Sequence, residues 1–245
     1  MSHTVDELLL RYIRTCWILK IRLISARRQL WGDEISLIHL ESASLQIRKI
    51  CEGIASLCVV ISDIEFEDIP DVRSDYQVGK IFNFLNKTQK LKFPNSARLN
   101  KVVDNKDQPS QWNLDEKSAD GSEVKRIKGL HDRLGMIMHE KSSYAEWPSQ
   151  SEAYAALVSD FKNLRAEHQW LWNRFWHHST RIKGKLFFVN FGAMTNSTQP
   201  SIVKMGGLID GDLDIQFDPN YLADFTNEVD WTEFTDAMDG AIPPL

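Results

Sequence analysis

Arg133 and His139 are the residues of this sequence best suited to chemistry on a phosphodiester. They lie six positions apart within residues 130–140, which carry apolar side chains at helical spacing. An imidazole can move protons near neutral pH, and an always-charged guanidinium can stabilise a phosphate in the transition state. The pair therefore suits cleavage of RNA through its own 2′-hydroxyl group, with no metal ion or cofactor.

Helix geometry limits how Arg133 and His139 could act together. Six residues of an α-helix set two side chains about 120° apart around the axis and about 9 Å apart along it. Two copies of the chain that face each other, each supplying an Arg and a His, would complete the site, so we expect a homodimer. Gly135, between the two residues, would admit a partner helix or a phosphate backbone.

The Arg-to-His spacing alone is weak, because 13 arginines and 7 histidines give about one such match by chance. A second pair, Arg126 and His131, lies earlier in the same helical stretch. A surface ion pair and an ordinary helix-ending histidine are the structural alternative to a catalytic pair. Further candidates are supporting residues and RNA-contacting cations: Asp132, His131, Glu140 and Lys141 for support, and Lys125, Lys128, Arg181 and Lys183 for RNA.

Charge is unevenly distributed along the chain. Residues 205–245 hold ten of the 34 acidic residues and none of the 29 lysines and arginines, which leaves residues 1–204 with a net charge of +5. A basic body can bind a polyanion that an acidic end masks or guides. A solvated tail is the structural alternative.

Composition indicates one large domain, or one domain with a small appendage, since 245 residues with 42% hydrophobic content can bury a sizeable core. The three cysteines form no paired framework and are expected in the core. Basic residues interrupt the most apolar stretch, near the N-terminus, and no secretory signal is evident. We therefore expect a cytoplasmic protein that does not enter a membrane.

Hydrophobic periodicity predicts a mainly α fold, an antiparallel helical bundle with a small C-terminal antiparallel β unit. The expected helices cover residues 5–30, 33–62, 76–87, 122–142 and 151–175, with Asp33 and Ser122 as caps. The expected strands cover residues 186–191, 201–204 and 213–217. Residues 1–178 would form the helical domain and residues 179–245 the acidic β-containing unit.

Two other segments carry separate expectations. Residues 95–121 are polar and should form an exposed loop or an extended, strand-like insertion. Between residues 170 and 185, aromatic residues alternate with basic ones, a composition that can stack and steer single-stranded RNA but is also typical of core aromatics beside a solvated basic face. This segment comprises Trp170, Trp172, Phe175, Trp176, His177, His178, Arg181, Lys183 and Lys185.

Residues 39–55, HLESASLQIRKICEGIA, and residues 130–141, LHDRLGMIMHEK, resemble the paired helices of the HEPN-like superfamily. In that superfamily a helical bundle carries an Arg, four to six residues and then a His. The pair that matches is Arg133 and His139. The resemblance covers residues 33–145 well and residues 168–203 more loosely.

The resemblance implies a dimeric, metal-independent endoribonuclease, often a toxin or a phage-defence effector. One departure is Leu134, which stands where active members usually have a polar residue directly after the Arg. The superfamily also includes non-catalytic modules, so the alternative is a module that binds RNA, a nucleotide or a protein partner such as an antitoxin.

Overall fold

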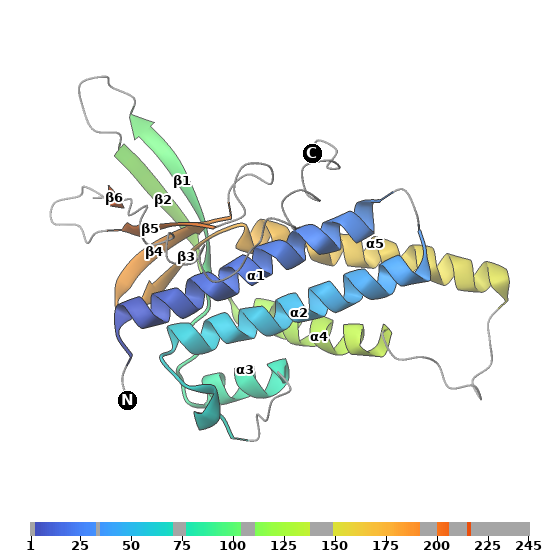
Figure 1. Cartoon of the computed structure of the whole chain (residues 1–245), viewed down its shortest axis with the longest axis horizontal. Coiled ribbons are helices and arrows are strands. Elements are labelled where there is room, and N and C mark those ends of the chain that lie inside the picture. The colour runs from blue at the N-terminus through green and yellow to red at the C-terminus, as the bar shows by residue number, and fades with distance from the viewer. Residues whose placement is uncertain are drawn as a thin grey trace, which may run out of the picture.

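A computed structural model describes residues 3–32, 35–70, 77–103, 111–137, 149–191, 200–205 and 215–216. Helices dominate these residues and an antiparallel sheet lies at one end of them (Figure 1), which confirms the fold class expected from the sequence. The helices are α1 (Val5–Trp31), α2 (Leu37–Ile61), the 3-10 turn η1 (Phe66–Asp68), α3 (Val78–Lys87), α4 (Gly121–Ile137) and α5 (Gln150–Phe175). None of the helices described is both long and apolar enough to cross a membrane.

Helices α1 and α2 form an antiparallel pair at the centre of the bundle (Figure 1). Thr4 and Glu7 form a capping box at the start of α1, and Ser36 caps α2 by accepting a hydrogen bond from the amide of His39. Asp33, the expected cap, lies outside the described residues. Gly53 brings the two helices close, because a Cβ at this position would lie 2.6 Å from Cδ2 of Leu19.

Helices α4 and α5 pack against this pair, and α3 lies below α2 and α4 in Figure 1. Asp120 caps α4, because its carboxylate accepts hydrogen bonds from the amides of Ser122 and Glu123, so the expectation that Ser122 caps this helix is wrong. The short side chain of Asp120, two residues before Ser122, reaches both free amides. Ser149 caps α5 through a capping box with Glu152. The expected end of α4 at residues 138–142 lies outside the described residues.

The strands form one antiparallel sheet in the order β2-β1-β3-β4-β5-β6. Strands β4 (Lys185–Asn190) and β5 (Ser201–Met205) confirm two expected strands, and β6 (Ile215–Gln216) is the described part of the third. Strand β3 (His177–Ile182) was not expected. It begins directly after α5 without a Gly or Pro to mark the change, and β1 and β4 flank it.

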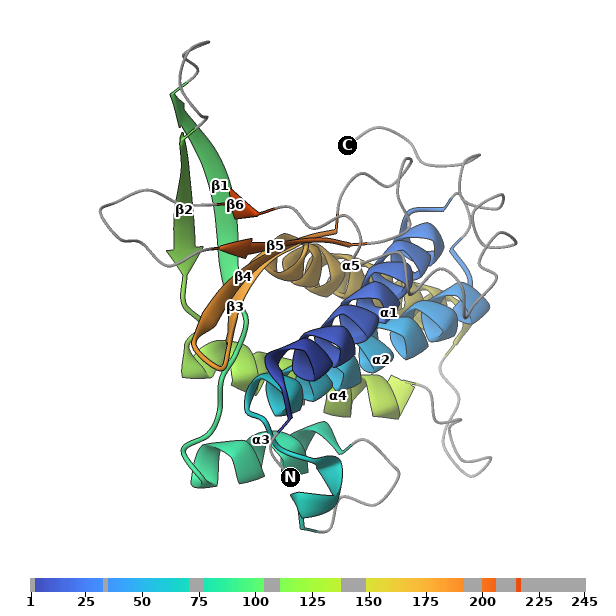
Figure 2. The same cartoon turned by 60° about the vertical axis from the view of Figure 1, so that its left-hand side comes forward.

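Residues 95–121 contain a hairpin, so the expectation of an exposed loop is corrected in favour of the strand-like alternative. Strand β1 (Asn95–Val103) pairs with β2 (Gln111–Lys117), and Ser96 of β1 pairs with His178 of β3. Figure 2 shows both strands projecting away from the helices. A hairpin that projects in this way needs few apolar residues, which explains its loop-like composition.

The sheet and the bundle share one hydrophobic core. Ile182, Phe187, Val189 and Phe191 are buried in the same cluster as the apolar faces of the helices. The domain boundary expected at residue 178 falls inside β3. Of residues 205–245, only Met205, Ile215 and Gln216 are described, so the expected acidic tail lies almost wholly outside the described residues.

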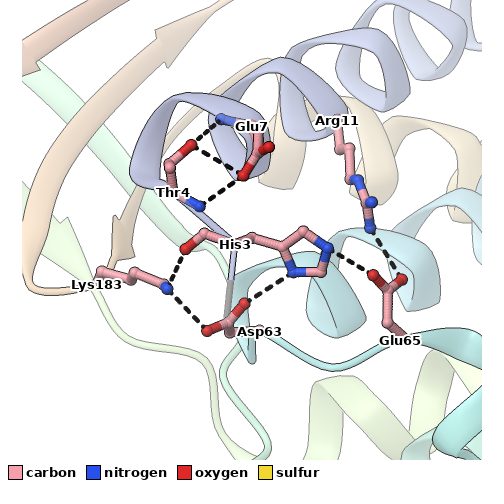
Figure 3. A network of polar contacts seen from close by, with 7 residues as sticks. All are labelled: His3, Thr4, Glu7, Arg11, Asp63, Glu65 and Lys183. Carbon is pink, nitrogen blue, oxygen red and sulfur yellow. Dashed lines mark hydrogen bonds and ion pairs between the residues drawn. The ribbon is translucent and has the colours of Figure 1, made fainter. Parts of the chain in front are cut away.

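A cluster of charged residues joins the start of α1 to the loop after α2 and to the β3–β4 turn (Figure 3). The imidazole of His3 lies between Asp63 and Glu65, Lys183 pairs with Asp63 at 3.0 Å, and Arg11 donates to Glu65 at 2.9 Å. Burial acts to raise the pKa of Asp63, but hydrogen bonds from Lys183 and His3 outweigh it and lower the pKa. The cluster therefore ties the N-terminus to the sheet mainly at pH values where the carboxyl groups are ionised.

Candidate functional site

Arg133 lies on α4 and points toward α5. Its Nη2 donates a hydrogen bond of 2.7 Å to Oε1 of Glu167, and its side chain remains 58% exposed. His139, Glu140 and Lys141 lie outside the described residues. The structure thus places Arg133 at the surface with its guanidinium hydrogen-bonded to α5.

Arg126 binds the same carboxylate. Its Nε donates to Oε2 of Glu167 at 2.8 Å, and its guanidinium carbon lies 4.2 Å from the centre of the Trp170 ring. Arg126 and Arg133 are seven residues apart, nearly two helical turns, which places them on one face of α4. The arginines of the two rival pairs therefore belong to one site, in which two cations share one carboxylate.

His131 lies on another face of α4. Its side chain is 9% exposed, its Nε2 is 3.6 Å from Oε1 of Glu52 on α2, and its Nδ1 is 3.4 Å from the exposed carboxylate of Asp132. Arg126 contacts α5 while His131 contacts α2. Within one chain the structure therefore does not bring Arg126 and His131 together.

Glu52 holds a small polar cluster between α2 and α4. Lys49 donates to it at 2.7 Å, and Arg48 lies 3.7 Å away. Burial acts to raise the pKa of Glu52, but the nearby imidazole of His131 and the hydrogen bond and charge of Lys49 outweigh it, so the pKa is lowered. A Cβ added to Gly135 would lie 2.9 Å from Nη1 of Arg48, so the neighbour of Gly135 in this chain is a guanidinium.

The other cations proposed for RNA have different surroundings. Lys125 is exposed on α4, whereas Lys128 donates to Asn83 of α3 at 2.8 Å. Arg181 lies 3.9 Å from Glu116, and Lys183 belongs to the cluster at the N-terminus. Of these four cations, Lys125 is the one next in sequence to Arg126, which binds the shared carboxylate.

The aromatic residues after residue 170 are mostly core. Trp172, Phe175, Trp176 and His178 are buried, and the rings of Trp172 and Trp176 stack at 3.8 Å. This confirms the structural alternative for those residues. Trp170 differs, because it is only partly buried and its ring faces Arg126.

Several other potential reactive groups are buried. Burial lowers the pKa of His168 and of His178 to about 4, and each ring donates to a backbone carbonyl. Burial also raises the pKa of all three cysteine thiols, Cys16, Cys51 and Cys58, which lie in the core as expected. These groups suit packing rather than proton transfer or nucleophilic attack near neutral pH.

Two acidic partners of the candidate residues were not identified from the sequence: Glu167, which binds both arginines, and Glu52, which lies beside His131. Glu52 interrupts the apolar run of α2, and Glu167 is followed by the buried His168. Glu52 is the one charged residue within residues 50–61 of α2, and this position in an apolar run is the signal that points to it. Among the residues that the structure describes, no three His, Cys, Asp or Glu side chains gather to hold a metal ion.

Comparison of the chain with models of protein families, with curated proteins and with solved structures found no match.

Proposed function

We propose that the protein is a metal-independent endoribonuclease of HEPN type, a toxin or phage-defence effector that cuts RNA at a composite site between two copies of the chain. The proposal rests on the sequence resemblance around residues 39–55 and 130–141. Arg133 is the phosphate stabiliser and His139 the general acid and base. RNA and a second copy are the partners, and the cytoplasm is the compartment.

The observation that supports the proposal best is the accessible, fixed guanidinium of Arg133. Its hydrogen bond to Glu167 restricts its position, while 58% of the side chain is exposed to a substrate. A preorganised cation stabilises developing charge without reorganising during the reaction. A second cation, Arg126, on the same carboxylate leaves one net positive charge at this surface.

The proposed reaction is transfer within RNA. A neutral imidazole of His139 accepts the proton of a ribose 2′-hydroxyl, and the 2′-oxygen forms a bond to the adjacent phosphorus. The bond from phosphorus to the 5′-oxygen breaks, and a protonated imidazole supplied by the second copy donates a proton to that oxygen. Arg133 stabilises the extra negative charge on the phosphate oxygens.

A non-catalytic module that binds RNA, a nucleotide or a protein partner such as an antitoxin is the second candidate. This candidate is favoured because Glu167 already pairs with Arg133 inside the chain, so its carboxylate competes with a substrate phosphate for the guanidinium. Leu134 fits either candidate, since this side chain is fully buried and a polar residue here would lose its contact with water. The departure from the family pattern therefore has a structural cause.

Cleavage of a mixed RNA substrate in EDTA tests the proposal. The intact protein, a version ending at Gln216 that keeps β6, and the His139→Ala variant of each are compared. Activity that His139→Ala and Arg133→Ala abolish, and that Lys162→Ala at an exposed position of α5 leaves within about twofold, supports the ribonuclease. The absence of cleavage by every version, with the dimer intact, favours the binding module.

A further inference from the structure

Arg126 is held in two directions at once. Glu167 binds its Nε edge at 2.8 Å, and the ring of Trp170 lies against its guanidinium at 4.2 Å. The side chain is still 41% exposed. A planar guanidinium fixed at one edge and covered on one side by a ring presents its remaining surface and its free N–H groups to solvent.

Glu167 fixes the relation between the two arginines. Its side chain is 15% exposed, and each of its oxygens accepts from a different guanidinium, Arg133 on Oε1 and Arg126 on Oε2. One carboxylate cannot neutralise both cations. The site therefore holds two cations on one carboxylate, with an excess of positive charge. Such a pair suits neighbouring phosphate groups along a nucleotide chain.

We infer that Arg126, Glu167 and Trp170 form a subsite beside Arg133 that takes an unpaired base and its phosphate, so the substrate is single-stranded RNA. Bases stack on guanidinium planes as well as on aromatic rings, and a base inside a duplex has both faces covered. Arg126 supports the base and contacts phosphate, Trp170 orients Arg126, and Glu167 is a positioning residue. The inference rests on the proposed function for the identity of the polymer.

The test separates binding from cleavage by using RNA whose 2′-hydroxyl groups are methylated, which the proposed reaction cannot cut. Fluorescence anisotropy measures binding of this RNA to the full chain, as a single strand and as a duplex. Arg126→Lys keeps the charge but removes the plane, and Trp170→Leu removes the orienting ring. Lys125→Ala, one position away on an exposed side chain, is the matched control.

We expect Arg126→Lys and Trp170→Leu each to weaken binding of the single strand about tenfold, as loss of one stacked base does. Binding of the duplex should change by less than about twofold, and Lys125→Ala should weaken both RNAs equally. Unchanged circular dichroism and thermal unfolding establish that the variants fold. Equal affinity of the wild type and both variants for the single strand overturns the inference, as does a wild type that prefers the duplex or binds neither RNA.

Glu167→Gln distinguishes positioning from simple neutralisation. If Glu167 only reduces charge, the variant binds both RNAs more tightly and keeps its preference for the single strand, which contradicts the positioning role. If Glu167 sets the geometry of Arg126 and Arg133, the preference for the single strand over the duplex falls about tenfold, although the overall affinity for RNA does not fall.

Failure of the inference and failure of the proposed function give different results. If the protein cuts no RNA but Arg126→Lys weakens its binding of the single strand, the subsite is present and the ribonuclease activity is absent. If cleavage requires His139 but Arg126→Lys and Trp170→Leu leave binding of the single strand unchanged, the protein is a ribonuclease that lacks this subsite.

Discussion

Removing the carboxylate of Glu123 should destabilise the fold, because this carboxylate pairs with a buried guanidinium. Arg174 of α5 is 6% exposed and its Nε donates to Glu123 of α4 at 2.9 Å. Its Nη2 donates to the carbonyl of Pro94, directly before β1, at 2.6 Å, and it lies over the rings of Phe93 and Phe175. Arg174 thus joins two helices to the sheet.

Glu123→Ala would leave the charge of Arg174 buried with one carbonyl as its partner. Breaking a buried ion pair costs about 3–5 kcal/mol, and because the side chain of Glu123 is 16% exposed we expect the lower end, about 3 kcal/mol. Urea unfolding followed by tryptophan fluorescence measures this free energy. Asp132→Ala, on the same helix and 76% exposed, is the control and should change stability by less than about 0.5 kcal/mol.

The double variant Glu123→Leu with Arg174→Met distinguishes an unpaired charge from simple loss of packing. Once Arg174 is apolar, no charge remains buried, so the double variant should be more stable than Glu123→Ala. A loss below about 1 kcal/mol for Glu123→Ala, or a double variant less stable than that single one, would refute the reasoning.

Three further predictions concern other parts of the fold. Gly53→Ala should lower stability by about 1–2 kcal/mol in urea unfolding, because the new methyl group meets the buried Leu19 at 2.6 Å and this overpacking exceeds the gain in helix propensity. Burial lowers the pKa of Lys20 from 10.5 to about 8, so the unfolded chain binds more protons between these values and stability should rise with pH there. Lys20→Met should abolish that rise in a pH series of urea unfolding. The pKa of Asp63 is lower in the folded protein than its ordinary value of 3.8, so ionised Asp63 stabilises the fold above pH 3.8. This stabilisation is lost as the pH falls through the pKa of Asp63 in the folded protein. In a pH series of thermal unfolding, Asp63→Asn should therefore lose less stability on acidification than the wild type.

The helices could be predicted because each buries a continuous apolar stripe against its neighbours. Val5–Trp31 and Gln150–Phe175 differ from the expected 5–30 and 151–175 by one residue at an end. Strands β1 and β3 could not be predicted by the same signal. Asn95–Val103 projects with its partner away from the bundle, and His177–Ile182 follows a helix without a break, so neither offers a clear apolar alternation between turn residues.

The acidic partners of the site could not be selected from the sequence, because their contacts are distant along the chain. Arg133 meets Glu167 across 34 positions, and His131 lies beside Glu52 from a helix much earlier in the chain. The chain has 34 acidic residues, and local spacing relates a residue only to neighbours within about one turn of its helix. Tertiary packing decides which carboxylate each cation meets.

Helix geometry also decides which pairing of the candidate residues can form one site. Arg126 and Arg133, seven residues apart, point within about 20° of each other, whereas Arg126 and His131 diverge by about 140°. The structure follows this rule, since both arginines reach Glu167 while His131 reaches Glu52. An imidazole that acts on a phosphate bound by the two arginines must therefore come from outside this face of α4. His139, about 120° from Arg133 on a continued helix, meets that requirement when a second copy supplies it. The proposed composite site would satisfy this requirement, and a ribonuclease that is active as a monomer would contradict the proposal.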